Sequence, residues 1–210
     1  MNIRELILRG EGTTLDFKKT ITSSEKIAKS LVAFSNNKGG VLLIGVADDG
    51  SIVGVKSEDE ERYMITKAAH QYCKPAIEPK FEEIYINHKL VLAVTIDQSD
   101  TKPHYALGSN KEWWAYYRVE DKTVLASKIV LEMLKDEQRE TGKMIVYSEL
   151  EQKLFNFLEL QGRITLRQFT KLTRISNKKA QKLLVNLLTT GILQLHLSEK
   201  EEYFTFINLK

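Results

Sequence analysis

The chain has 210 residues, of which 42% are hydrophobic and 28% charged, the composition of an ordinary globular protein and not of a disordered or collagen-like one. This length fits one large domain or two small ones, and we take two as the working expectation. No apolar run reaches the about 18 residues of a membrane span, and no signal-like stretch follows the first residues, so we expect a cytoplasmic protein with no membrane contact. The single cysteine, Cys73, excludes an intrachain disulfide and a cysteine-rich zinc site.

The net charge of +3 is unevenly distributed along the chain. Residues 1–140 carry 20 Lys and Arg against 22 Asp and Glu, whereas residues 141–210 carry 11 against 6. No acidic residue occurs between positions 161 and 188, although this segment contains seven cations. Such a stretch is typical of a surface that binds a polyanion; the alternative is a solvated helix face.

Hydrophobic periodicity predicts a mixed α/β domain over residues 1–140. Thr22 or Ser23 is the expected cap of its first helix, and the continuous apolar run at 41–46 is typical of a strand buried on both faces. The expected elements are a helix over 23–34, a strand over 41–46, a turn over 48–50, a returning strand over 52–55, a helix over 58–72, strands over 81–86, 90–96 and 113–119, and a helix over 124–140.

Residues 141–210 show a different pattern, with helices followed by two strands. We expect helices over 149–160, 166–172 and from 177 onward, then strands over 192–197 and 203–207. The short helix, turn and longer helix have the proportions of a helix-turn-helix, and the terminal hairpin supplies a wing. The predicted fold class is therefore α+β, with a second, winged-helix domain after a charged junction at 135–143.

The second domain carries the predicted nucleic-acid-binding residues. In the helix that starts near Asn177, the cations fall off the face formed by its apolar residues, as a recognition helix requires. Cations near the preceding helix are better placed to hold phosphates. A protein-docking module is the alternative use of such a fold. The predicted contacts are Arg163, Arg167, Lys171, Arg174, Asn177, Lys178, Lys179, Gln181 and Lys182.

Several ordered motifs in the first domain resemble those of the Schlafen AlbA-type domain, over about residues 5–130. Such a domain is often followed by a helix-turn-helix in bacterial transcriptional regulators. The resemblance therefore implies double-stranded DNA as partner, and winged-helix regulators commonly act as homodimers. The motifs are residues 11–18 (EGTTLDFK), 33–40 (AFSNNKGG), 43–50 (LIGVADDG), 53–54 (VG), 102–105 (KPHY) and 116–119 (YYRV).

The same resemblance implies a second function. Animal Schlafen proteins cleave structured RNA with a carboxylate triad and a divalent metal, and Glu11 and Asp16 stand at the first two positions, with Asp48 or Asp49 as the third. Oxygen ligands of this kind suit Mg²⁺ or Mn²⁺; without that activity no cofactor is expected. Asp16 is shorter than the usual Glu, and the zinc site of those animal proteins has no counterpart. Alternatively, these acids cap turns or pair with lysines.

Other catalytic classes find no support in the sequence. The segment 38–40 (KGG) precedes a strand, whereas a phosphate-binding loop follows a strand and opens a helix. Cys73 and His70 are three positions apart on one predicted helix and have no third partner, which is not the pattern of a cysteine hydrolase.

Overall fold

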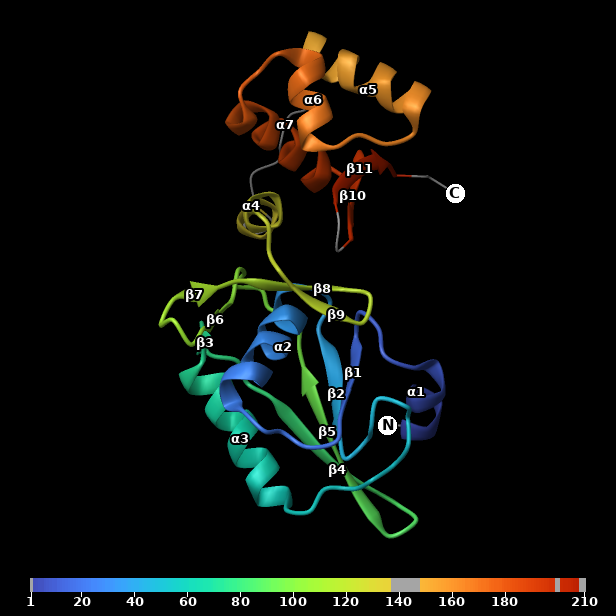
Figure 1. Ribbon diagram of the computed structural model, residues 1–210, viewed down its shortest axis with the longest axis vertical. Helices are drawn as coiled ribbons and strands as arrows, with labels where there is room; N and C mark the ends of the chain where they lie inside the picture. The colour runs from blue at the N-terminus through green and yellow to red at the C-terminus, as the bar shows by residue number, and fades with distance from the viewer. Residues whose placement is uncertain (1, 137–147, 199–200, 208–210) are drawn as a thin grey trace. The chain divides into compact units, whose positions relative to one another are not determined.

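The computed structural model describes residues 2–136, 148–198 and 201–207 (Figure 1). The chain divides into two compact units, Met1–Ser127 and Lys128–Lys210, called here the first and the second unit. In the described part of the chain, no helix is both long and apolar enough to cross a membrane.

The first unit mixes helices and strands, as predicted. Its helices are α1 (Ile3–Arg9), α2 (Ser24–Asn36) and α3 (Glu58–Gln71). Its strands are β1 (Leu15–Lys18), β2 (Gly40–Ile44), β3 (Cys73–Lys74), β4 (Lys80–Ile86), β5 (Lys89–Ile96), β6 (Tyr105–Leu107), β7 (Trp113–Trp114), β8 (Tyr116–Val119) and β9 (Lys122–Leu125).

The centre of the first unit is a four-stranded sheet in the order β1-β2-β5-β4. The strand pair β1 and β2 is parallel, and the other two pairs are antiparallel. One face packs against α2 and α3, and the other packs against α1 (Figure 1). Along β2, Leu42 and Ile44 enter the first of these cores and Leu43 enters the second, so the prediction of a strand buried on both faces is confirmed.

Three predicted elements differ from the structure. Residues 52–55 form only one bridge, between Val46 and Ile52, because β1 and β5 already occupy both edges of β2. The run 113–119 breaks at Ala115 into β7 and β8, which belong to different sheets. The helix predicted from Val124 starts at Lys128 instead, because residues 122–125 pair with β8 as β9; its end, 137–140, lies outside the described residues.

The second unit has the predicted order of three helices and a hairpin, preceded by one further helix. Its elements are α4 (Lys128–Asp136), α5 (Glu149–Gln161), α6 (Leu166–Thr173), α7 (Asn177–Thr189), β10 (Leu193–Leu197) and β11 (Glu202–Phe206). The sequence places α4 in the first domain, which it ends at 140, but Ile129 packs in the core of the second unit. The division therefore falls after Ser127, because apolar burial assigns α4 to the second unit. Most of the predicted junction 135–143 lies outside the described residues.

Local polar contacts define the helix ends of the second unit. Ser148 with Glu151, and Thr165 with Gln168, form capping boxes at the starts of α5 and α6. Arg174 takes a left-handed conformation with φ of 54°, which ends α6 and turns the chain into α7. The residues that form each of these signals lie within a few positions of one another, so the signals need no tertiary contact.

The turn from α2 into β2 is packed too tightly for any side chain. A Cβ at Gly39 would lie 2.7 Å from the Ile96 carbonyl oxygen, and one at Gly40 would lie 2.5 Å from the Phe34 ring. Gly39 also has a φ of +70°, which favours glycine. The Gly-Gly pair thus allows β2 to start directly beneath α2.

We predict that Gly40→Ala destabilises the protein by about 1–3 kcal/mol, because the new methyl group would overlap the Phe34 ring. Gly12→Ala is the matched control, since a Cβ there meets nothing within 4 Å. Urea unfolding of both variants checks the prediction. Equal stabilities for the two would contradict it.

Candidate functional site

The predicted nucleic-acid contacts lie just before α6, on α6, on the turn after it and at the start of α7. All nine side chains are exposed except Gln181, which is half-buried. On α7 the opposite face is formed by Ala180, Leu184 and Leu187, which are buried in the core of the second unit. The expected separation of cations from apolar residues is therefore present.

The start of α7 is a positively polarised end of a 13-residue helix. Ser176 accepts a hydrogen bond from the Lys179 N–H at 3.3 Å, which leaves the N–H groups of Asn177 and Lys178 without an intrahelical acceptor. Two lysine side chains extend from the same turn. Backbone donors, helix dipole and ammonium groups all favour an anion at this position.

Arg163 differs from the other predicted contacts because it is tied to the terminal hairpin. Its guanidinium forms an ion pair with Glu201 at 3.1 Å and lies 5.1 Å from the centroid of the Tyr203 ring. None of the other six cations in this set forms an ion pair with a described residue. The structure therefore gives Arg163 a role in holding the hairpin, which sequence spacing did not indicate.

The acidic candidates of the first unit form a pair, Glu11 and Asp16. Oε1 of Glu11 accepts a hydrogen bond from the Phe17 N–H at 2.7 Å, and the Glu11 carboxyl group is hydrogen-bonded to that of Asp16. Asp16 also faces two cations, with Lys18 Nζ at 2.9 Å and an Arg118 nitrogen at 3.5 Å. The predicted pairing of these acids with Lys18 is therefore present for Asp16.

The two carboxyl groups have pKa values that shift in opposite directions. Burial, aided by the hydrogen bond with Asp16, raises the pKa of Glu11 to about 7. Burial also raises the pKa of Asp16, but Glu11, Lys18 and Arg118 outweigh that effect and lower it below its usual range. Of the two carboxyl groups, Glu11 is therefore the one that holds a proton up to about pH 7, while Asp16 is ionised.

Arg118 is the residue that positions this pair, and the sequence did not single it out as a site residue. Its buried guanidinium donates to the carbonyl oxygens of Gly12 at 2.8 Å and Leu15 at 3.2 Å, besides facing Asp16. The group also lies 4.9 Å from the centroid of the Phe34 ring. The sequence signal that could have identified Arg118 is its position within the YYRV motif.

Other motif residues serve the same packing. The Asn36 side chain donates to the carbonyl oxygens of His104 and Tyr116, both at 2.9 Å, and accepts from the His104 N–H at 2.7 Å. Asn37 donates to the Arg118 carbonyl oxygen at 3.0 Å. The motifs at 33–40, 102–105 and 116–119 are thus joined through buried amide groups.

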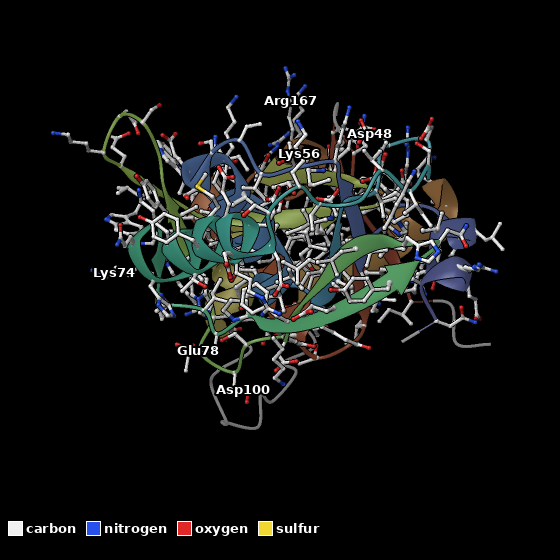
Figure 2. All side chains as sticks on the ribbon, turned by 90° about the horizontal axis from the view of Figure 1, so that it is seen from below. Asp48, Lys56, Lys74, Glu78, Asp100 and Arg167 are labelled. Carbon is white, nitrogen blue, oxygen red and sulfur yellow. The ribbon has the colours of Figure 1, made fainter. Side chains whose placement is uncertain are left out.

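Asp48 is not brought to this pair. It is exposed at the surface of the first unit (Figure 2), and its neighbour Asp49 caps a turn by accepting from the Ser51 N–H at 2.8 Å. Among the described residues, no group of three Asp, Glu, His or Cys side chains is arranged to hold a metal ion. The implied Mg²⁺ or Mn²⁺ does not fit, because the oxygens of Asp16 face Lys18 and Arg118.

We predict that Glu11→Gln changes how stability depends on pH. The folded state binds the Glu11 proton more tightly than the unfolded state, so stability falls as the pH rises from about 4.5 to about 7. Glutamine keeps an acceptor for Phe17 and a donor for Asp16. The free energy of unfolding of the variant minus that of the wild type should therefore be about 1–2 kcal/mol larger at pH 8 than at pH 4.5. This range is kept small because solvent screens the half-exposed Glu11 side chain.

Urea unfolding of the wild type and the variant at both pH values measures this change. Glu5→Gln, on α1, provides the control for removal of one carboxylate. Parallel pH profiles for Glu11→Gln and the wild type would show that the carboxyl pair does not hold a proton.

The comparisons with known proteins agree with the motifs. The family described as Schlafen, AlbA_2 matches residues 11–127, which is more than half of the chain. No curated protein matches the chain.

The solved structures that are similar to it include the following two. One is the N-terminal domain of a protein related to the ATP-dependent DNA helicase RecG from Nitrosomonas europaea, at 19% identity and a TM-score of 0.44, covering 70% of this chain and 92% of that one. The other is the DIP2311 protein of Corynebacterium diphtheriae, at 14% identity and a TM-score of 0.47, covering 92% of this chain and 34% of that one. This chain thus spans about a third of the DIP2311 chain. Both likenesses are distant, so the family is assigned from the match over residues 11–127 alone, and the chain belongs to the Schlafen AlbA_2 family.

Proposed function

We propose that the protein is a cytoplasmic transcriptional regulator that binds double-stranded DNA through its second unit, and that this unit is a winged helix. The observation that carries the proposal is the set of exposed cations on α6 and α7 that have no described acidic partner. Membership of the Schlafen AlbA_2 family supports a nucleic-acid-related function in general.

The arrangement of the second unit supports the winged-helix proposal. A left-handed residue connects α6 to α7, and β10 and β11 pair as an antiparallel hairpin after α7. Ile164, between α5 and α6, adds a bridge to Phe204 of β11. In a winged helix the second helix of the helix-turn-helix enters the major groove, and here that helix is α7.

The proposed interface has two kinds of contact, to phosphates from α6 and to base edges from α7. Arg167 and Lys171 are one turn apart on α6, so they project from the same face and suit successive phosphate contacts. Asn177, Lys178 and Gln181 lie in the first two turns of α7, where side chains of a recognition helix reach base edges. Arg163 holds the hairpin through Glu201 and Tyr203, so it acts by positioning the wing.

Binding of DNA as a homodimer is part of this proposal. Winged-helix regulators commonly read two half-sites, and a two-fold protein matches a palindromic site. The first unit then assists assembly or DNA binding. A monomer in light scattering at micromolar concentration, with and without duplex DNA, would remove this part of the proposal.

We predict that Lys178→Glu with Lys179→Glu weakens duplex binding by roughly 30-fold or more near 0.1 M salt, and lowers the slope of log affinity against log salt by about 2, because two cations at the duplex-facing start of α7 are replaced by anions. Fluorescence anisotropy with a labelled duplex measures both quantities. Lys26→Glu with Lys56→Glu is the matched control, since it makes the same charge change on exposed lysines of the first unit, of which Figure 2 labels Lys56. Equal effects of the two pairs would contradict the proposed interface.

The alternative function is an endoribonuclease of the Schlafen kind. The adjacency of Glu11 and Asp16 favours it, whereas the lack of a third acid beside them among the described residues counts against it. Folded tRNA incubated with the protein in Mg²⁺, Mn²⁺ or EDTA tests this function. For the regulator we expect intact RNA in every lane. Metal-dependent cleavage that Glu11→Gln abolishes, with the fold retained, would establish the nuclease and leave the second unit as its targeting module.

A further inference from the structure

A second, smaller surface of the first unit has no role in the duplex-binding proposal. The strands β3, β6 and β7 form a three-stranded sheet in that order. One face of this sheet, with Cys73 and Ala106, is buried in the core. Alternation along the strands places Lys74, Tyr105, Leu107 and Trp113 on the opposite face, and Lys74 lies at the outer surface (Figure 2). We call these four residues the tryptophan surface.

The aromatic content of this surface is unusual for solvent-exposed strands. The chain has two tryptophans, Trp113 and Trp114, and both are on β7. Their exposed fractions are 40% and 39%, although a large aromatic ring is ordinarily among the more buried side chains. Both lie on an edge strand, since β7 pairs with β6 alone among the described strands. The Trp113 ring, which is the one on the tryptophan surface, is therefore available to a flat partner.

A cation accompanies the exposed ring. Lys74 Nζ lies 5.9 Å from the centroid of the Trp113 ring, and this lysine forms no ion pair with a described residue. Lys111, in the turn before β7, is a second exposed cation. The one acidic residue of that turn, Glu112, has its carboxylate engaged by the Asn110 side chain. The surface thus combines an aromatic face with available positive charge.

The turn that presents the tryptophans is held in place by its own backbone. The Gly108 N–H donates to the Glu112 carbonyl oxygen, and the Lys111 N–H donates to the Gly108 carbonyl oxygen, both at 2.9 Å. The Asn110 side chain also accepts from the Glu112 N–H at 3.2 Å. A rigid turn lowers the entropy that a ligand has to overcome when the aromatic residues are ordered against it.

We propose that the tryptophan surface binds single-stranded nucleic acid, with a base stacked on Trp113 and the adjoining phosphate near Lys74. Base stacking on aromatic residues beside cations is the usual chemistry of such binding, and it needs no particular base sequence. A second copy of the chain fits less well, because two-fold pairing of this surface would bring the Lys74 side chains of both copies together. The inference does not rest on duplex binding by the second unit.

Intrinsic fluorescence tests this proposal directly, because the chain has only two tryptophans, Trp113 on the proposed surface and its neighbour Trp114 on β7. The full chain carrying Lys178→Glu and Lys179→Glu is titrated with a 12-nucleotide oligo(dT), so that the second unit contributes little. We expect saturable quenching that weakens with salt. Trp114→Phe in the same chain should retain it, since Trp113 is then the sole reporter. Absence of quenching in both proteins would overturn the proposal.

Variants separate stacking from a structural role. Anisotropy of labelled oligo(dT) should show about tenfold weaker binding for Trp113→Ala and a smaller loss for Trp113→Phe, which keeps a ring. Tyr85→Ala is the matched control, as Tyr85 is a 67% exposed aromatic residue on β4. Equal losses for Tyr85→Ala and Trp113→Ala, at unchanged thermal stability, would overturn the proposal. Fluorescence that changes with protein concentration alone would assign the surface to self-association instead.

Discussion

The first unit depends on the contacts of one buried group, the guanidinium of Arg118. A charge with only 2% of its side chain exposed is costly unless every neighbour compensates it. Asp16 supplies the counter-charge, Gly12 and Leu15 supply carbonyl oxygens, and the Phe34 ring lies against the group. Through these contacts one side chain joins β8, the turn before β1 and helix α2, which are distant in the chain.

The same contacts explain why the acidic motif suits both metal binding and pairing with cations. Glu11 and Asp16 have the chemistry of metal ligands, yet the oxygens of Asp16 face two cations and burial raises the pKa of Glu11. A carboxylate that compensates a buried arginine lowers the energy of the folded chain and is withdrawn from other ligands. The family motifs at 11–18 and 116–119 are thus two halves of one packing arrangement.

The second unit is built on a different principle. Its helix ends are set by neighbouring residues, such as Ser148 with Glu151 and Arg174 after α6, and its core is a single apolar cluster. Nothing buried in that cluster requires a charge, so the cations of α6 and α7 stay on the outside. The two proposed surfaces also differ in chemistry, because α6 and α7 expose cations whereas β7 exposes an aromatic ring.

The amino-acid sequence by itself determined the features that depend on local spacing. Helices α2, α3, α5, α6 and α7, strand β2, the terminal hairpin and the exposed cations followed from periodicity, caps and turns, which act within a few residues. Only the tertiary structure decided which edges of β2 were occupied, that α4 packs with the second unit, and that Arg118 clamps Asp16. It also separated Asp48 from Glu11 and tied Arg163 to Tyr203. These outcomes depend on contacts between distant segments, whose free energies come from burial and charge compensation and leave no periodic trace in the sequence.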